Sequence, residues 1–152
     1  MNDEPRMQPS SLDSWVASRR VRQFAEVLLR VGLSTSLLSA VADRFGVWGR
    51  PGSPQVAWGT FSHFLAYTKT LNPWCPPALV PALGWSATSA ELVLGLALLV
   101  RFRLRWTALL TALLTGTFAL AMTCVEGVHA PLNYSVFAFS AASFFLAVMS
   151  EK

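Results

Sequence analysis

Four apolar stretches, each of about 20 residues, constrain this chain more than any other feature of its sequence. They cover residues 23–42, 81–100, 106–124 and 132–149. An α-helix of about 20 residues crosses the roughly 30 Å hydrocarbon core of a bilayer and satisfies its own backbone hydrogen bonds there. The sequence therefore predicts an all-α membrane protein, a bundle of four transmembrane helices that occupies residues 23–149.

Charged residues are rare and lie mostly at the ends of these stretches. Only 13% of the 152 residues are charged and 53% are apolar, whereas a soluble domain carries about 25% charged residues. The basic residues form short clusters rather than one surface stripe, which argues against nucleic-acid binding. Eight of them fall in the tail, in the connection 101–105 and at the C-terminus, and three fall in the other two connections. By the positive-inside rule, we expect a multi-pass protein of the bacterial inner membrane with both termini in the cytoplasm.

The N-terminal part allows two interpretations. Residues 1–22 are polar, and we expect a flexible cytoplasmic tail that turns helical near the N-cap residues Ser11–Asp13. A cleaved signal peptide is the alternative for the first apolar stretch, because Ala40–Ala42 resembles a cleavage site and the flank is basic. Glu26 and Arg30 interrupt that stretch, and this favours an uncleaved span.

The long connection 43–80 is predicted to lie outside the cytoplasm. Its first part is rich in glycine and proline, which mark a loop. Side chains suited to one face of a helix then recur, at Ala57, Phe61, Phe64, Leu65 and Thr68. This segment is too short and too polar to span a bilayer. We therefore predict an amphipathic helix at the outer interface, with Trp58 and Trp74 as aromatic anchors.

Glu91 lies near the middle of the second apolar stretch. A carboxylate at mid-membrane costs about 2.5–3.5 kcal/mol on insertion scales, so it needs a partner, a proton or a function. At about 1.5 Å per residue, Glu91 lies about 13 Å and Arg30 about 10 Å from the cytoplasmic face. We therefore predict a buried Arg30–Glu91 ion pair, which Glu26 joins from one turn before Arg30, unless it snorkels to the headgroups.

Two interpretations of this cluster stay open. A buried ion pair can fix the register of two helices without any catalysis. Alternatively, Glu91, Arg30 and Glu26 are candidate catalytic residues of a proton or quinone site. Thr111 and Thr115 bracket Glu91 in depth, so they are candidates for contacting a quinone, although threonines in helices commonly bond their own backbone. No cofactor motif other than this arrangement is evident.

The two cysteines, Cys75 and Cys124, are both expected on the outer side. They form no CxxC motif, which argues against thioredoxin-like chemistry. Three alternatives stay open: free thiols, a structural disulfide, and a redox-active pair. An oxidising compartment would permit the disulfide, but the sequence does not establish the distance between the two residues.

The histidines, His63 and His129, both fall in external segments. No histidine lies within a predicted span, so an axially ligated haem inside the membrane is not expected. Together with Asp43 and Glu126 they are weak candidates for an outer metal site, and solvated loop residues are the default interpretation. We predict no metal site.

Four stretches of the chain resemble the DoxX-like family of small bacterial membrane proteins. They read LLRVGLSTSLLSAVADRFG, W-x-x-F-x-x-F-L, SAELVLGLALLVRFRLRWTALLTALL and HAPLNYSVFAFSAASFFLA, within residues 24–148. Arg44 stands where family members often carry a lysine. The resemblance implies a four-helix bundle and a link to respiratory or sulfur redox chemistry, since relatives form the membrane subunit of a thiosulfate:quinone oxidoreductase. It also favours Arg30 and Glu91 as functional positions.

Three functions are compatible with these observations. The first is a membrane component of a quinone- or sulfur-linked redox system, which acts with a soluble or membrane-bound partner protein. The second is a non-catalytic scaffold that recruits or stabilises another protein. The third is a small transporter built as a homo-oligomer, although four helices are few and no inverted repeat is visible. Whether the chain is an enzyme is left open.

Overall fold

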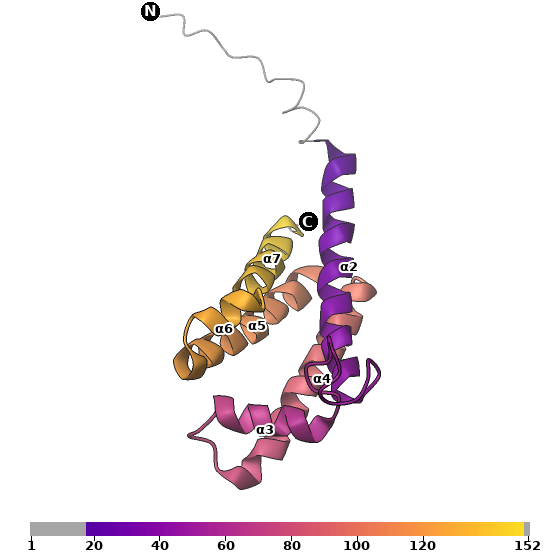
Figure 1. Cartoon of the computed structure of the whole chain (residues 1–152). Coiled ribbons are helices and arrows are strands. Elements are labelled where there is room, and N and C mark those ends of the chain that lie inside the picture. The colour runs from indigo at the N-terminus through magenta and orange to yellow at the C-terminus, as the bar shows by residue number, and fades with distance from the viewer. Residues whose placement is uncertain (1–17, 151–152) are drawn as a thin grey trace, which may run out of the picture.

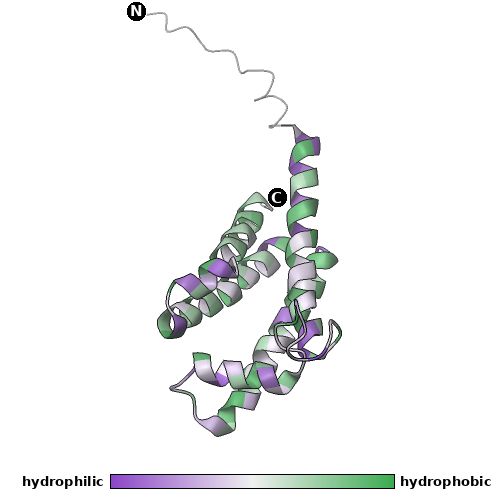
Figure 2. Cartoon of the chain, viewed as in Figure 1, coloured by the Kyte–Doolittle hydropathy of each residue, from purple (hydrophilic) through white to green (hydrophobic). Residues whose placement is uncertain are grey.

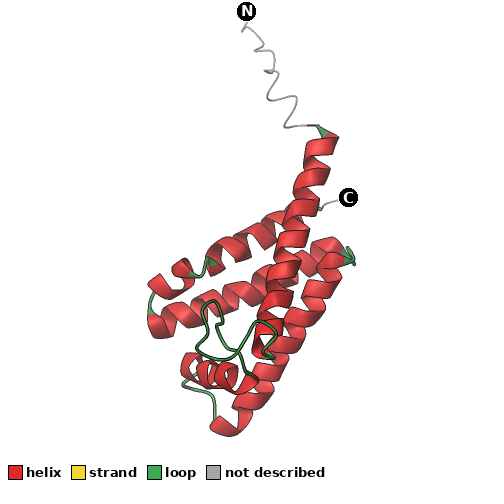
Figure 3. Cartoon of the chain, turned by 45° about the vertical axis from the view of Figure 1, so that its right-hand side comes forward, coloured by secondary structure: helices red, strands yellow, loops and turns green. Residues whose placement is uncertain are grey.

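The computed structural model describes residues 18–150 and contains only helices and loops in that range (Figure 3). Three helices are long: α2 (Arg19–Arg44), α4 (Val80–Leu99) and α5 (Leu104–Glu126). The shorter elements are α3 (Phe61–Leu71), η1 (Pro77–Leu79), α6 (His129–Asn133) and α7 (Val136–Met149). Figure 1 shows α2 and α4 on one side of the molecule, with α5 and α7 beside each other on the other side.

Three segments are long and apolar enough to cross a membrane: Arg19–Arg44, Pro77–Leu99 and Leu104–Glu126. The prediction of an all-α membrane protein is confirmed at this level. The fourth predicted span, 132–149, is not one continuous helix, because α6 ends at Asn133 and α7 has only 14 residues. By length and composition, three helices can cross a membrane, and Val136–Met149 is a shorter apolar helix.

The interruption between α6 and α7 has a local cause. Ser135 lies in the left-handed region with a φ of 55°, a conformation that costs a non-glycine residue roughly 1–2 kcal/mol. Its backbone N–H bonds to Leu132 O, and the next helix starts from Ser135 O, which accepts from Phe139 N. Serine and asparagine compete with helical hydrogen bonding through their side chains, so the Asn133–Ser135 stretch is a natural place for a break.

The first long helix differs from its predicted bounds at both ends. It begins at Arg19, where the Ser18 hydroxyl caps the N–H of Val21 at 3.4 Å, and it continues to Arg44. The predicted span was 23–42, so the observed helix is four residues longer at the start and two at the end. The predicted N-cap at Ser11–Asp13 lies outside the described residues.

Four helices form two antiparallel pairs, α2 with α4 and α5 with α7. In the first pair, the Ser34 hydroxyl donates to Gly95 O at 2.7 Å. In the second, the Ser140 hydroxyl donates to Ala112 O at 2.8 Å. Small residues at these positions let the backbones approach closely, which is the usual way that helices associate in membranes. On α4, the buried residues recur every three or four positions: Val80, Gly84, Thr88, Glu91, Gly95 and Leu98.

The two pairs meet in a compact apolar cluster. Its buried members come from all four helices: Leu33, Leu37, Leu98, Leu104, Ala108, Leu146 and Ala147. The end of α7 thus packs beside the start of α5 and the end of α4. The last turn of α7 therefore lies at the same end of the bundle as the α4–α5 connection.

Large apolar side chains cover much of the outer surface of the long helices, and Figure 2 shows hydrophobic residues along their whole length. Phe24, Leu113 and Val93 are each about 60% exposed or more. On a soluble protein such a surface would be an aggregation hazard. On this chain it is the surface that faces lipid.

Helix α3 lies against α4, with Phe64 and Thr68 buried. A methyl group at Gly84 would collide with Leu65, so the glycine lets α3 approach. Phe64 and Thr68, which the spacing places on one face of a helix, are therefore on the face of α3 that is buried. Trp58 is not a free anchor, because it packs on the rings of Phe64 and Tyr67, at 5.6 and 4.8 Å between centroids. Trp74 is 75% exposed.

Candidate functional site: a buried arginine–glutamate pair

Glu91 forms an ion pair with Arg44, the last residue of α2. The Arg44 Nη2 atom donates to both carboxylate oxygens of Glu91, at 2.7 Å to Oε1 and 2.8 Å to Oε2. Glu91 is 2% exposed and Arg44 is 5% exposed. A charge pair this well buried persists only when its geometry is close and its remaining polar atoms are engaged.

The surroundings of the pair come from α3 and α4. Arg44 Nη1 donates to the Thr88 hydroxyl at 2.8 Å, and that hydroxyl donates to Gly84 O at 2.8 Å. The guanidinium carbon lies 3.7 Å from the ring centroid of Phe64, a cation–π distance. Among the described residues, Arg44 Nε alone of the three guanidinium nitrogens has no hydrogen-bond partner. The cluster therefore joins three helices through one arginine side chain.

The predicted Arg30–Glu91 pair is wrong, and helix register explains why. Ser34 contacts Gly95, and because α2 and α4 are antiparallel, residues before Ser34 lie beside residues after Gly95. Arg30 therefore lies beside the end of α4, about two helical turns from Glu91. Helical side chains lean toward the N-terminus of their own helix, so Arg44 reaches back along α2 to Glu91.

The depths estimated for Arg30 and Glu91 are misleading because the ends of both spans were taken from hydropathy alone. Ending the first span at residue 42 places Arg44 in the connection 43–80, whereas α2 continues to Arg44. The helical spacing of α2 continues to Arg44, which is the one signal in the sequence that could have indicated an inward arginine there.

Asp43, next to this pair, organises the loop that follows α2. Its Oδ2 atom accepts from the backbone N–H groups of Ala57 and Trp58, at 3.1 and 2.7 Å. Asp43 is 6% exposed, so the expectation of a solvated loop residue is wrong. Sequence reasoning missed this role, because two backbone donors some 15 residues away leave no motif.

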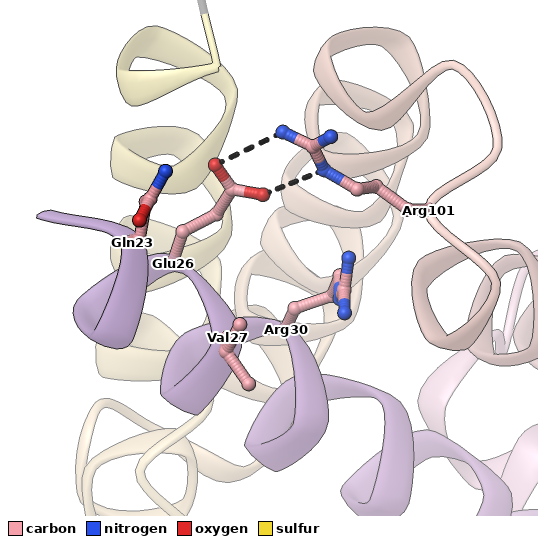
Figure 4. A pocket seen from close by; sticks show the side chains of 5 residues that line it. All are labelled: Gln23, Glu26, Val27, Arg30 and Arg101. Carbon is pink, nitrogen blue, oxygen red and sulfur yellow. Dashed lines mark hydrogen bonds and ion pairs between the residues drawn. The ribbon is translucent and has the colours of Figure 1, made fainter. Parts of the chain in front are cut away.

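A second polar cluster lies at the other end of the bundle. Arg101 donates to Glu26 through Nε at 2.8 Å and through Nη2 at 3.4 Å, so Glu26 does not join Glu91 in a triad. These two residues line a cleft of about 380 Å³ together with Gln23, Val27 and Arg30 (Figure 4). The hydrogen bond to Glu26 raises the pKa of Arg101 above its ordinary value.

Thr111 and Thr115 are buried but bond within their own helix, to Thr107 O at 2.9 Å and Thr111 O at 2.8 Å. This is the backbone-bonded alternative that the sequence left open. The carboxylate of Glu91 accepts from Arg44 instead.

Both cysteines are free thiols; Cys75 is buried and Cys124 is exposed. Within residues 18–150, no group of three histidine, cysteine, aspartate or glutamate side chains is arranged to hold a metal ion. His63 Nδ1 lies 3.2 Å from Trp58 O.

Glu126 instead accepts from the Tyr67 hydroxyl at 2.8 Å and connects α3 to the end of α5. Burial raises the pKa of Tyr67 above its ordinary value of 10.0, and the hydrogen bond to Glu126 adds to the effect.

Comparison of the chain with protein-family models, with curated proteins and with solved structures finds no match in any of the three.

Proposed function

We propose that this chain is a non-catalytic membrane component of a larger assembly. The observation that carries the proposal is the closed geometry of the Arg44–Glu91 pair. Both carboxylate oxygens accept from one arginine nitrogen, and Glu91 is 2% exposed. A carboxylate that exchanges protons with a quinone must reach both the quinone and a proton path, and this one is enclosed by Thr88 and Phe64.

The structural interpretation of the cluster is supported by what it connects. Arg44 belongs to α2, Phe64 to α3 and Glu91 to α4. Fixing the register of helices is the best-attested use of a buried polar group. We therefore assign Glu91 a structural role and place no quinone beside it.

The assembly that the chain serves is proposed to be a quinone- or sulfur-linked redox system. This part rests on the sequence resemblance to the DoxX-like family, and the electron-transfer chemistry then belongs to a partner protein. Recruitment of a partner without any redox role is the alternative. The expected cellular location of the protein is the bacterial inner membrane.

The topology that we propose has four passes and both termini in the cytoplasm. Leu146 and Ala147 of α7 pack with Leu104 and Ala108 of α5, so α7 returns to the end of the bundle where α5 starts. The segment from His129 to Met149 is 21 residues long and 19 of these belong to α6 and α7, while about 20 helical residues cross a bilayer. Under this topology α3 lies at the outer interface.

The test is to purify the chain from its native membranes in mild detergent and to measure two properties. Native mass spectrometry is expected to show the chain in a stoichiometric complex, and the isolated chain is expected not to reduce a soluble quinone analogue with thiosulfate or sulfide as donor. The Glu91→Gln variant keeps the size of the side chain and removes its charge. We expect that variant to form the complex but to melt at a lower temperature.

Quinone reduction by the isolated chain, lost in Glu91→Gln while the melting temperature is unchanged, would overturn the proposal. A Thr117→Ala variant serves as the control, because Thr117 is exposed and bonds only to Leu114 O of its own helix.

A further inference from the structure

The cleft at the α4–α5 end of the bundle combines two arginines with one glutamate. Figure 4 shows Glu26 and Arg101 paired across the gap between α2 and the α4–α5 connection, with Arg30 one turn further along α2. Gln23 and Val27 complete the lining, and the volume is about 380 Å³. Counting one charge for each ionised side chain, the lining carries a net charge of +1.

Within residues 18–150, the positive charge of the cleft is only partly neutralised by its one carboxylate. Glu26 is engaged by Arg101. The Arg30 Nε atom is buried and has no hydrogen-bond partner among the described residues. A buried guanidinium N–H without a partner is costly, so an anion in the cleft would supply what the described part of the chain does not.

Arg101 is held at the cleft in an unfavourable backbone conformation. Its φ is 61°, in the left-handed region, where glycine is the usual residue at the end of a helix. The N–H of Phe102 bonds to Ala97 O at 2.9 Å, and that of Arg101 bonds to Leu98 O at 3.2 Å, as in a Schellman motif. A glycine would fit this turn better, but it would lose the ion pair that Arg101 forms with Glu26.

The cleft lies among side chains suited to lipid. Phe24, Val100 and Phe102 are between 61% and 71% exposed. Arg101 follows directly after α4, and Arg30 is one turn, or about 6 Å, further along α2 than Glu26. Under the proposed topology, both guanidinium groups lie toward the cytoplasmic side of the bundle. Arginine binds phosphate oxygens through its forked N–H groups.

We propose that this cleft binds the phosphate group of an anionic ligand, and that the ligand is an anionic phospholipid. The phosphate lies between Arg30 and Arg101, and the acyl chains run along the apolar surface beside them. Basic pockets between membrane helices on the cytoplasmic side are a known mode of headgroup recognition. The site does not depend on the Arg44–Glu91 pair, which lies toward the other end of α2.

The test compares lipids by thermal unfolding and by native mass spectrometry of the detergent-purified chain. Phosphatidylglycerol and phosphatidylcholine share a phosphodiester, but the choline group cancels the negative charge of the second lipid. We expect phosphatidylglycerol to raise the melting temperature by roughly 3–5 °C, with little shift from phosphatidylcholine. Inorganic phosphate is the third probe, and a water-soluble phosphate compound is its counterpart in the cell.

Two variants locate the site. Arg101→Gly removes the side chain and relieves the left-handed backbone, so the variant is expected to fold and to lose most of the shift. Arg30→Gln is expected to lose it as well. Arg103→Gly is the matched control, because Arg103 has a φ of 39° in the same connection and does not line the cleft.

The results separate the outcomes clearly. A phosphatidylglycerol shift that Arg103→Gly keeps and the other two variants lose supports the lipid site. An equal shift with inorganic phosphate, lost in the same two variants, supports the phosphate site and assigns it to a soluble ligand. Equal shifts from both lipids would overturn the proposal, because the effect would then not depend on the headgroup. Equal losses in all three variants would overturn it too, because the loss of any arginine in this region would then have the same effect.

Discussion

At the scale of single residues, the neighbouring residues Asp43 and Arg44 of α2 make different contacts. Asp43 accepts a hydrogen bond from the backbone of the following loop, and Arg44 forms an ion pair with Glu91 of α4. Both are nearly fully buried, although an Asp-Arg pair after an apolar stretch looks like an ordinary solvated flank. Through these two buried side chains, the end of α2 connects to the following loop and to α4.

Replacing Asp43 by alanine is expected to loosen the loop 45–60. The change leaves two backbone N–H groups without an acceptor in a partly buried position, at a cost of roughly 1–3 kcal/mol for each group that water does not reach. The variant should show faster hydrogen exchange at Ala57 and Trp58 and a lower melting temperature. Thr35→Ala is the control, since the Thr35 hydroxyl is exposed and bonds only to Val31 O and Gly32 O. Unchanged exchange at Ala57 and Trp58 would contradict this role.

Tyr67 is expected to titrate above its ordinary pKa of 10.0. Because the folded state holds the proton more tightly than the unfolded state, the contribution of Tyr67 to stability is complete below about pH 10 and is lost as pH rises further. The measurement is an ultraviolet titration of Tyr134→Phe, which leaves Tyr67 as the one tyrosine in the chain. The midpoint should fall in the added variant Glu126→Gln but stay above 10, since burial is the larger cause. Coinciding midpoints in the folded and denatured protein would refute the prediction.

At the scale of the elements, close approach depends on a few small residues. Gly95 lies where a methyl group would meet Leu38 Cγ and Cδ2 at 3.0 Å and Leu37 Cβ at 3.4 Å. Gly32 lies in the middle of α2 and has nothing within 4 Å of the same position. Two glycines in apolar helices therefore differ in what they do.

The two glycines provide a matched pair of substitutions. Gly95→Ala is expected to destabilise the α2–α4 pair by roughly 1–3 kcal/mol, because the added methyl overpacks the contact. Gly32→Ala is expected to be neutral or to stabilise by up to about 1 kcal/mol through helix propensity. Thermal unfolding of both variants in the same detergent checks the difference. Equal effects would mean that the antiparallel contact is looser than described.

The sequence predicted the elements well and their mutual register poorly. Apolar length was enough for the three long helices, and spacing was enough to place Phe64 and Thr68 on one face of α3. Register depends on which small residues meet, such as Ser34 with Gly95, and a hydropathy count does not contain that information. The candidate site shows both outcomes: Glu91 was correctly identified as a residue needing a partner, and its partner was not.

At the scale of the whole molecule, the two antiparallel pairs give the bundle two unlike ends. One end carries the enclosed Arg44–Glu91 pair under α3, and the other carries the Arg101 connection and the cleft. The break at Ser135 lies between α6 and α7 on the return path to the second end. Because the break divides the fourth apolar segment into two short helices, the location of the C-terminus determines whether that segment crosses the membrane.

Reporter fusions at the two termini are expected to place both in the cytoplasm. A fluorescent protein that folds only in the cytoplasm and an exported alkaline phosphatase give opposite signals, so each terminus is read twice. Insertion of the phosphatase after Gly52, in the loop that follows α2, should give the outer signal. Termini on opposite sides would show three passes, with α6 and α7 outside the set of crossings.

A double-mutant cycle on Arg44 and Glu91 tests the central claim most directly. Removing one partner, by Arg44→Met or Glu91→Leu, should lower the free energy of unfolding by about 3–5 kcal/mol, because it leaves a buried charge uncompensated. The double variant should recover most of that loss, since an apolar pair of similar volume needs no partner. Single variants that each leave the stability unchanged, or losses that simply add in the double variant, would contradict the account that this pair ties the bundle together.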